Sequence, residues 1–253
     1  MRNMKKLRNQ RKVQLLSALL TNPHLTNFFS GKIYKGPFKN LCSSGLNCYS
    51  CPAAGLSCPI GALQTVSASN RFRLSYYVVG FLIFLGAIFG RMICGFFCVF
   101  GFLQDLLYKI PLKKITLPAK LDKALRYLKY LILLIFVILL PLLITNEFGL
   151  ADPFFCKYIC PAGTIEGGIP LLLMNASLRD MAGSLFLFKL VLAIICILAV
   201  IMIPRAFCRY ICPLGAIYSL FQKVSLIKLT LEDDKCISCN RCITVCPMGV
   251  DVL

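Results

Sequence analysis

The sequence predicts an all-α integral membrane protein with about four transmembrane helices and cysteine-rich segments between and after them. Two observations of composition support this expectation: 58% of the 253 residues are hydrophobic and only 15% are charged, with a mean hydropathy of +0.77. A soluble domain usually has about 45–50% apolar and about 25% charged residues. The apolar residues also lie in long blocks, which argues against an ordinary soluble enzyme and against a disordered chain.

Four stretches of the sequence are candidate membrane spans. The first, residues 13–30, is only moderately apolar, and an interfacial or re-entrant helix is the alternative for it. Three stronger stretches follow at 74–93, 128–145 and 185–203. Each of these three is long enough to cross about 30 Å of hydrocarbon, where only a helix satisfies its own backbone hydrogen bonds. The stretches divide the chain into a basic N-terminus with a weak span (1–30), a cysteine-rich loop (31–73), a membrane core (74–203) and a C-terminal segment (204–253).

Basic residues predict the orientation in the membrane. The chain has 28 Lys and Arg against 10 Asp and Glu, which gives a net charge of +18. Six basic residues lie in each of the segments 1–12, 94–127 and 204–253, but 146–184 has only two. Cytoplasmic loops are enriched in Lys and Arg, so we expect both termini on the cytoplasmic side of the cell membrane and 146–184 outside. The 31–73 loop, with five basic residues, then lies outside and fits this rule less well; it moves inside if the first stretch does not span.

The residue types exclude several redox cofactors. The chain has 15 Cys but a single His, His24, and no Trp. A c-type haem needs a C-x-x-C-H motif, a b-type haem needs His or comparable axial ligands, and a Rieske centre needs two His on one iron. Haem is therefore not expected. Metal sites built from four thiolates remain, which are either structural zinc sites or iron–sulfur clusters.

The C-terminal cysteines have the spacing C-x2-C-x2-C-x3-C-P, which is typical of bacterial ferredoxins. In that spacing a tight loop places three thiolates around one corner of a [4Fe–4S] cluster, and the fourth Cys usually ligates the neighbouring cluster of a two-cluster protein. A zinc site of four cysteines normally uses two separated C-x2-C pairs instead. The sequence therefore predicts a [4Fe–4S] site with the metal ligands Cys236, Cys239, Cys242 and Cys246.

A second motif, C-x3-C-x2-G, occurs three times at the ends of the predicted spans, in the pairs Cys94–Cys98, Cys156–Cys160 and Cys208–Cys212. Residues i and i+4 of a helix share one face, with Cβ atoms about 5–6 Å apart, so each pair can offer two thiolates to one cluster. Pro follows the second Cys in two copies and disfavours helical geometry at that Cys. Ordinary buried cysteine is the alternative. Since the second and fourth spans end on the same side, we expect one joint site from Cys94, Cys98, Cys208 and Cys212.

The 31–73 loop has four cysteines within seventeen residues rich in Gly, Ser and Pro: Cys42, Cys48, Cys51 and Cys58. They are enough for one four-thiolate site on irregular backbone. Two disulfides are the alternative if the loop faces an oxidising medium. Cys58 also begins Cys58-Pro-Ile-Gly61, the second half of the repeated motif. The remaining cysteine, Cys196, lies among Ile and Leu in the middle of a span and is not expected to be a ligand.

These motifs resemble those of the polytopic membrane polyferredoxins, the NapH/NosR/FixG-like 4Fe-4S binding proteins, and the resemblance extends over residues 13–247. The three C-x3-C pairs, the cysteine-rich loop and the C-terminal run carry it. The chain differs from the family pattern in two places. Val99 stands where Pro follows the second Cys in the other pairs, and no second ferredoxin-type run follows Cys246 before Leu253. The second difference removes support for a second soluble cluster and is what a truncated product would show.

The resemblance implies electron transfer between quinol or flavin-bearing partners and other redox proteins. The expected function is a membrane-bound iron–sulfur protein that passes electrons from a quinol, flavoprotein or ferredoxin-type donor to a partner reductase. It would use two or more [4Fe–4S] clusters and no catalytic residues of its own. An assembly or regulatory factor for a metalloenzyme is the alternative. A metal transporter would need polar residues within the spans, which are nearly absent, and no soluble basic face is present for nucleic acid.

Overall fold

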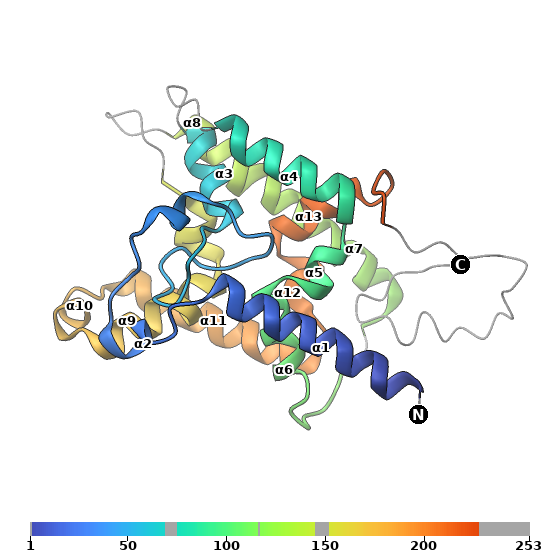
Figure 1. The fold of residues 1–253 in the computed structure, drawn as a ribbon, viewed down its shortest axis with the longest axis horizontal. Helices are drawn as coiled ribbons and strands as arrows, with labels where there is room; N and C mark the ends of the chain where they lie inside the picture. Colours follow the sequence, from blue (N-terminus) through green and yellow to red (C-terminus); the bar gives the residue numbers. More distant parts are fainter. Residues whose placement is uncertain (1, 69–74, 116, 145–151, 228–253) are drawn as a thin grey trace, which may run out of the picture.

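The computed structural model describes residues 2–68, 75–115, 117–144 and 152–227. All regular elements in these ranges are helices (Figure 1), and the one β-type contact among them is an isolated bridge between Cys42 and Ser57. The predicted all-helical class is therefore confirmed for the described part of the chain. The ferredoxin-type run, Cys236 to Cys246, lies outside the described residues.

The first predicted span is two helices with a break between them. Helix α1 covers Arg2–Thr21 and α2 covers Asn27–Ser30, and the break falls at Pro23, whose ring cannot continue a helix. The inner face of α1 is polar: Gln14 donates to the Gly95 carbonyl at 2.9 Å, and Ser17 donates to the Phe97 carbonyl at 3.0 Å. Its outer face exposes leucines, among them Leu20 at 70%. Residues 13–30 therefore do not form the single continuous span that was predicted for them.

The cysteine-rich loop contains one short 3₁₀ helix, η1 (Pro37–Asn40), and ends in helix α3 (Pro59–Ala68). The second predicted span is shorter than expected. Helix α4 covers only Ser75–Phe89, because Gly90 adopts the left-handed conformation (φ +50°) that ends a helix. Two short helices follow it, α5 (Met92–Phe96) and α6 (Val99–Leu107).

Two described helices are long and apolar enough to cross a membrane, over Lys120–Leu143 and Ser184–Met202. The first consists of α7 (Ala119–Ile132), a π-helical segment η2 (Leu133–Leu139) and α8 (Leu140–Leu143). It starts earlier than the predicted 128–145. The prediction left out its first turns because they carry charged residues, which lower the hydropathy there. The second is α11 (Ser184–Met202), which agrees closely with the predicted 185–203. The expectation of four spans is therefore not met among the described helices.

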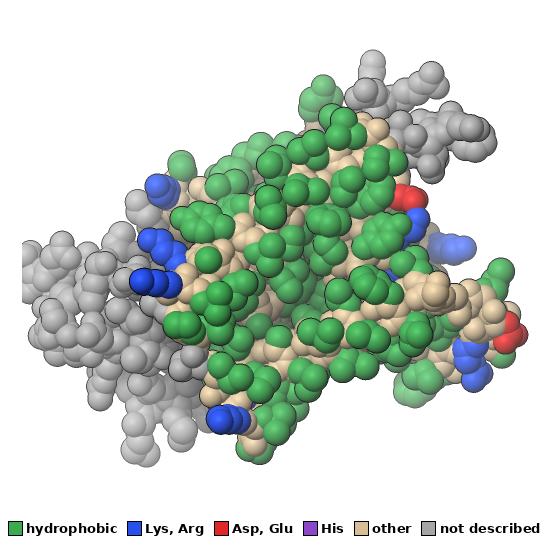
Figure 2. Space-filling model, turned by 180° about the vertical axis from the view of Figure 1, so that it is seen from behind, with side chains coloured by type: hydrophobic (Ala, Val, Ile, Leu, Met, Phe, Trp, Pro, Cys, Tyr) green, Lys and Arg blue, Asp and Glu red, His purple; other side chains and the backbone are tan. Residues whose placement is uncertain are grey.

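The remaining helices are short and complete the bundle. Between the two long helices lie two π-helical segments and two α-helices: η3 (Phe155–Ile159), η4 (Gly163–Gly168), α9 (Ile169–Met174) and α10 (Ala176–Asp180). After α11 come α12 (Ala206–Tyr210) and α13 (Pro213–Phe221). Hydrophobic side chains cover most of the face shown in Figure 2. Such an extensive apolar surface is unusual for a soluble monomer and agrees with contact to lipid.

The two long helices generate a prediction about topology. If both cross the bilayer, the segment before α7 and the segment before α11 lie on opposite sides, with the basic segment cytoplasmic. We expect a cytoplasm-active reporter to work when fused at Lys114, and an export-dependent reporter to work when fused at Asn175. If one and the same reporter were equally active at Lys114 and at Asn175, the helix over Lys120–Leu143 would not cross the membrane.

Candidate functional site

The C-x3-C motif forms a turn between two helices, not one helical face. Cys94 lies in α5, but Cys98 is extended (φ −84°, ψ 118°) and caps α6, where its Sγ accepts a hydrogen bond from the Gly101 N–H at 3.4 Å. Cys208 in α12 and Cys212 before α13 repeat this geometry. The expected i,i+4 placement on one helix is therefore wrong, because the second Cys leaves the helix to cap the next one. The non-helical conformation expected for a cysteine that precedes proline is confirmed at Cys212 (φ −65°, ψ 115°).

In two of the three copies of the motif, the glycine lies close to the backbone of the first cysteine. A Cβ atom on Gly101 would lie 2.9 Å from the Cys94 carbonyl oxygen, and one on Gly215 would lie 3.2 Å from the Cys208 carbonyl oxygen. Glycine lets the start of the following helix pass this close to the first cysteine of the pair. Gly163 of the middle copy has no such backbone contact, so this explanation applies to the two turns at Cys98 and Cys212.

Four cysteines from two of these turns face one another, and we call this group site 1: Cys94, Cys98, Cys208 and Cys212. All four are buried. Burial, and then the neighbouring Cys98 and Cys94, raise the pKa of Cys208 well above its ordinary value. Burial, and then Cys208 and Cys94, do the same for the pKa of Cys212. Two turns more than 100 residues apart in the sequence are thus brought together, as the sequence analysis expected.

Polar groups contact the sulfur atoms of site 1. The Gln104 side chain donates from Nε2 to Cys208 Sγ at 2.9 Å, and the Leu46 backbone N–H donates to Cys98 Sγ at 3.4 Å. The Phe100 and Phe207 rings pack edge to face with centroids 5.0 Å apart, and both side chains are almost fully buried. Site 1 is therefore a dry site with N–H donors directed at its thiols.

Arg205 holds the two turns of site 1 together. It is only 3% exposed and is the one described non-glycine residue with positive φ (49°). Its guanidinium donates to both oxygens of Asp105, at 2.7 and 2.5 Å, and to the Cys94 carbonyl at 3.2 Å. A bidentate pair of this kind fixes both distance and orientation, so the ends of α6, α5 and α12 are tied to one another beside the thiols.

A second group of four cysteines forms site 2: Cys48, Cys58, Cys156 and Cys160. Burial raises the pKa of Cys160 well above its ordinary value, and Cys156, Cys48 and Cys58 raise it further. All four line one cavity of about 660 Å³ between the loop, α3 and the segment 153–163. Site 2 thus combines two cysteines of the loop with the middle C-x3-C pair, a combination that the sequence analysis did not predict.

Gln64 contacts a thiol of site 2 in the way that Gln104 contacts one of site 1. Its Nε2 donates to Cys156 Sγ at 3.3 Å, and its Oε1 accepts from the Phe155 N–H at 2.9 Å. Both glutamines lie six residues after a capping cysteine, in Cys58-x2-Gly-x2-Gln64 and Cys98-x2-Gly-x2-Gln104. The sequence analysis missed these glutamines, although the shared offset from the cysteine was a signal that could have found them.

The other two turns also place a polar residue six positions after the capping cysteine. After Cys160 it is Glu166, whose carboxylate accepts from the Cys48 N–H at 2.9 Å. After Cys212 it is Tyr218, whose hydroxyl donates to the Ser44 carbonyl at 2.8 Å. Burial raises the pKa of Glu166 to about 7, against the effect of the Cys48 hydrogen bond. Both residues fasten the cysteine-rich loop to the helical core, and neither was singled out from the sequence.

The remaining described cysteines lie outside both groups of four. Cys42 lines the cavity of site 2, and Cys51 is buried against Ala53 and Ala54. Cys196 is buried within α11, as expected for a packed residue. All cysteines in the described part of the chain are free, so the loop has no disulfide there. No three potential ligands among the described residues converge tightly enough for a single metal ion, whereas a cubane distributes its four thiolates over four iron atoms.

The comparisons with known proteins agree with this donor set. A family profile described as a 4Fe-4S binding domain matches residues 74–118, 129–170 and 185–232, one copy for each C-x3-C pair. The chain belongs to this family of 4Fe-4S binding proteins. A second profile, also described as a 4Fe-4S binding domain, matches residues 229–250, which contain the ferredoxin-type run. Iron–sulfur binding is therefore the chemistry of the family to which the three C-x3-C turns and the C-terminal run belong.

Several curated relatives are similar to this chain in sequence. A Methanocaldococcus jannaschii protein described as uncharacterized is 31% identical over 76% of this chain and 66% of its own length. YccM of Escherichia coli, whose name proposes electron transport, is 26% identical over 79% of this chain and 54% of its own length. The methylamine utilization ferredoxin-type protein MauN of Paracoccus denitrificans is 27% identical over 76% and 62%. The chain thus spans about half to two thirds of these relatives. No solved structure matches it.

The turn geometry generates a prediction for stability. Gly101→Ala places a Cβ 2.9 Å from the Cys94 carbonyl oxygen, so we expect a loss of about 1–3 kcal/mol through overpacking. Gly80→Ala is the matched control, because nothing lies within 4 Å of its added Cβ and alanine favours helix by about 1 kcal/mol over glycine. Thermal unfolding in detergent, followed by circular dichroism, should show a lower midpoint for Gly101→Ala only. Equal midpoints for both variants would contradict the close-approach explanation.

Proposed function

We propose that this chain is a membrane-bound electron-transfer protein that passes electrons from a quinol, flavoprotein or ferredoxin-type donor to a partner reductase. In this proposal sites 1 and 2 each hold a [4Fe–4S] cluster, and the C-terminal run holds a further cluster at the cytoplasmic side. The observation that carries it is the convergence of site 1, where distant turns supply four buried thiols. The names of YccM and MauN, which refer to electron transport and to a ferredoxin type, support the same role.

The residues of both sites fit this cofactor. Each site offers four cysteines and no competing His, and thiolates are the ligands that [4Fe–4S] clusters require. Backbone N–H groups of Gly101, Gly215 and Leu46 and the Gln104 side chain already point at sulfur atoms in site 1. Such donors stabilise the negative charge that thiolates carry when they bind metal. A [4Fe–4S] cluster, when bound, accepts and releases an electron without a proton acceptor being required.

Charged side chains lie beside both sites. Arg205 lies beside site 1, is buried, and stays charged because a guanidinium is not deprotonated in proteins; it is paired with Asp105. Beside site 2, the Glu166 carboxylate accepts from the Cys48 N–H and the Lys189 ammonium donates to the Cys156 carbonyl. A nearby positive charge stabilises an added electron, and burial weakens the screening of this effect. Arg205 and Lys189 would therefore each favour the reduced state of a cluster bound at their site.

The two-site arrangement predicts which substitutions act together. We expect Cys98→Ser and Cys212→Ser to remove the same EPR signal, and Cys58→Ser and Cys160→Ser to remove a second signal. Each variant should lose the four iron atoms of one cluster. The measurement is EPR of anaerobically purified, dithionite-reduced protein, together with iron and acid-labile sulfide analysis.

Two further variants serve as references for this experiment. Cys196→Ser removes a buried cysteine outside both sites and should leave all signals in place. Cys239→Ser should remove a third signal, from the C-terminal run. Unchanged iron in Cys98→Ser would mean that site 1 holds no cluster. Zinc without acid-labile sulfide in the parent protein would overturn the proposed function as a whole.

The glutamine contacts predict separate changes in reduction potential. Gln104→Leu keeps the side-chain volume but removes the donor to Cys208, so the midpoint potential of the site 1 signal should fall, because hydrogen bonds to sulfur stabilise the reduced cluster. Gln64→Leu should lower only the midpoint potential of the site 2 signal. Gln10→Leu is the control, since Gln10 donates to the Gly95 carbonyl and to no thiol. Potentiometric titration monitored by EPR measures both midpoint potentials. If a single variant shifted both potentials equally, the two sites would not be separate.

A further inference from the structure

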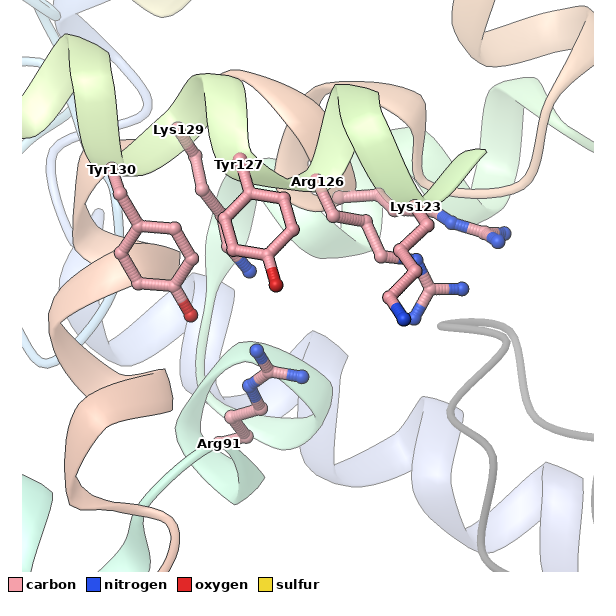
Figure 3. Close-up of a pocket in the computed structure, with 7 residues that line it drawn as sticks. Arg91, Lys123, Arg126, Tyr127, Lys129 and Tyr130 are labelled. Carbon is pink, nitrogen blue, oxygen red and sulfur yellow. The ribbon is translucent and has the colours of Figure 1, made fainter. Parts of the chain in front are cut away.

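A pocket rich in basic side chains lies between α7 and the turn that joins α4 to α5. It has a volume of about 200 Å³ and is lined by two tyrosines and five basic residues: Arg91, Lys123, Arg126, Lys129 and Arg209. Figure 3 shows Lys123, Arg126 and Lys129 extending from α7 toward the side of the pocket where Arg91 stands. The pocket borders site 1, because Arg209 follows Cys208 directly in the sequence and Arg91 and Lys129 lie within electrostatic range of Cys94.

Only some of the cations that line this pocket are paired with a carboxylate of the described residues. Asp122 accepts from Arg126 at 2.7 Å and from Arg209 at 2.5 Å, and it also accepts from the Tyr210 hydroxyl at 2.6 Å. Three other lining cations have no ion pair in the described part of the chain: Arg91, Lys123 and Lys129.

Lys129 and Arg91 supply the more specific observation. Lys129 is only 3% exposed, and within the described chain it has no carboxylate or hydrogen-bond acceptor. The Tyr130 ring lies 5.1 Å from its Nζ, and the thiols of Cys94 and Cys212 lie within electrostatic range. The Nε atoms of Arg91 and Arg209 are likewise buried without a hydrogen-bond partner among the described residues. Burying a cation without an anionic partner costs free energy. This arrangement is therefore typical of a site that binds an anion from outside the chain.

We propose that this pocket binds a phosphate group. A phosphate presents several anionic oxygens in a compact shape, which matches the planar donor forks of the arginines and the point charge of a lysine. The pocket lies at the basic end of the helix over Lys120–Leu143, where the headgroup of an anionic phospholipid would lie if this helix spans the bilayer. A soluble phosphate ester offers the same chemistry, and the two sources are separated by experiment.

The test uses the full-length protein purified in a neutral detergent, with and without exchange into nanodiscs. One arm measures the binding of inorganic phosphate by calorimetry. The other counts phosphatidylglycerol retained per protein by mass spectrometry, in nanodiscs that contain both phosphatidylglycerol and phosphatidylcholine. Lys129→Gln and Lys123→Gln remove pocket charges, and Lys123 is exposed, so its variant keeps the test valid if Lys129→Gln does not fold. Lys113→Gln removes an exposed lysine outside the pocket and is the matched control.

We expect the pocket variants to weaken binding at least about tenfold, as the loss of one charge-assisted hydrogen bond does, and Lys113→Gln to leave it unchanged. An effect in the calorimetric arm alone identifies a soluble phosphate ligand, and an effect on retained phosphatidylglycerol alone identifies the lipid. Equal binding by all variants in both arms overturns the proposal. So does a shift in the potential of the site 1 signal without any change in phosphate binding, because Lys129 would then only balance charge at that site. Iron content, measured in parallel, separates this outcome from failure of the proposed clusters.

Discussion

The fold depends on one local interaction, the hydrogen bond from a glycine N–H to the thiol of a cysteine that caps a helix. This interaction ends one helix and starts the next within a few residues, and it directs the sulfur inward. At Cys98 and Cys212 the bond is 3.4 Å long, and the glycine passes close to the carbonyl of the preceding cysteine. Because the turn recurs along the chain, the surrounding helices are arranged so that capping cysteines of different turns meet in pairs.

Both cysteine sites combine two capping cysteines with two further cysteines, and they differ in the origin of one of these. In site 1 the capping cysteines Cys98 and Cys212 are each accompanied by the first cysteine of their own pair. In site 2 the turn at Cys58 lacks that first cysteine, since Ala54 stands four residues before it, and Cys48 of the loop takes its place. The loop is held there by Glu166, which accepts from the Cys48 N–H. The cysteine that one turn lacks is thus replaced by a loop cysteine that a different turn holds in place.

Much of this arrangement was predictable from local sequence, but its long-range contacts were not. Apolar length predicted α11 closely, and the spacing of Cys94, Cys98, Cys208 and Cys212 predicted their joint site. Hydropathy alone overestimated the second span, because it does not detect that Gly90 ends α4 in a left-handed conformation. The partner of the middle cysteine pair was also missed, since nothing in the loop's composition indicates that Cys48 and Cys58 lie beside Cys156 and Cys160.

The distance in sequence between the two halves of site 1 has a consequence for biogenesis. Cys94 and Cys98 leave the ribosome more than 100 residues before Cys208 and Cys212. Closing so long a loop is slow relative to local helix formation. In the proposed function, a cluster at site 1 would have all four of its ligands only after Cys212 has been translated. The order of the motifs along the chain would then make loading of site 1 a late event in the maturation of the protein.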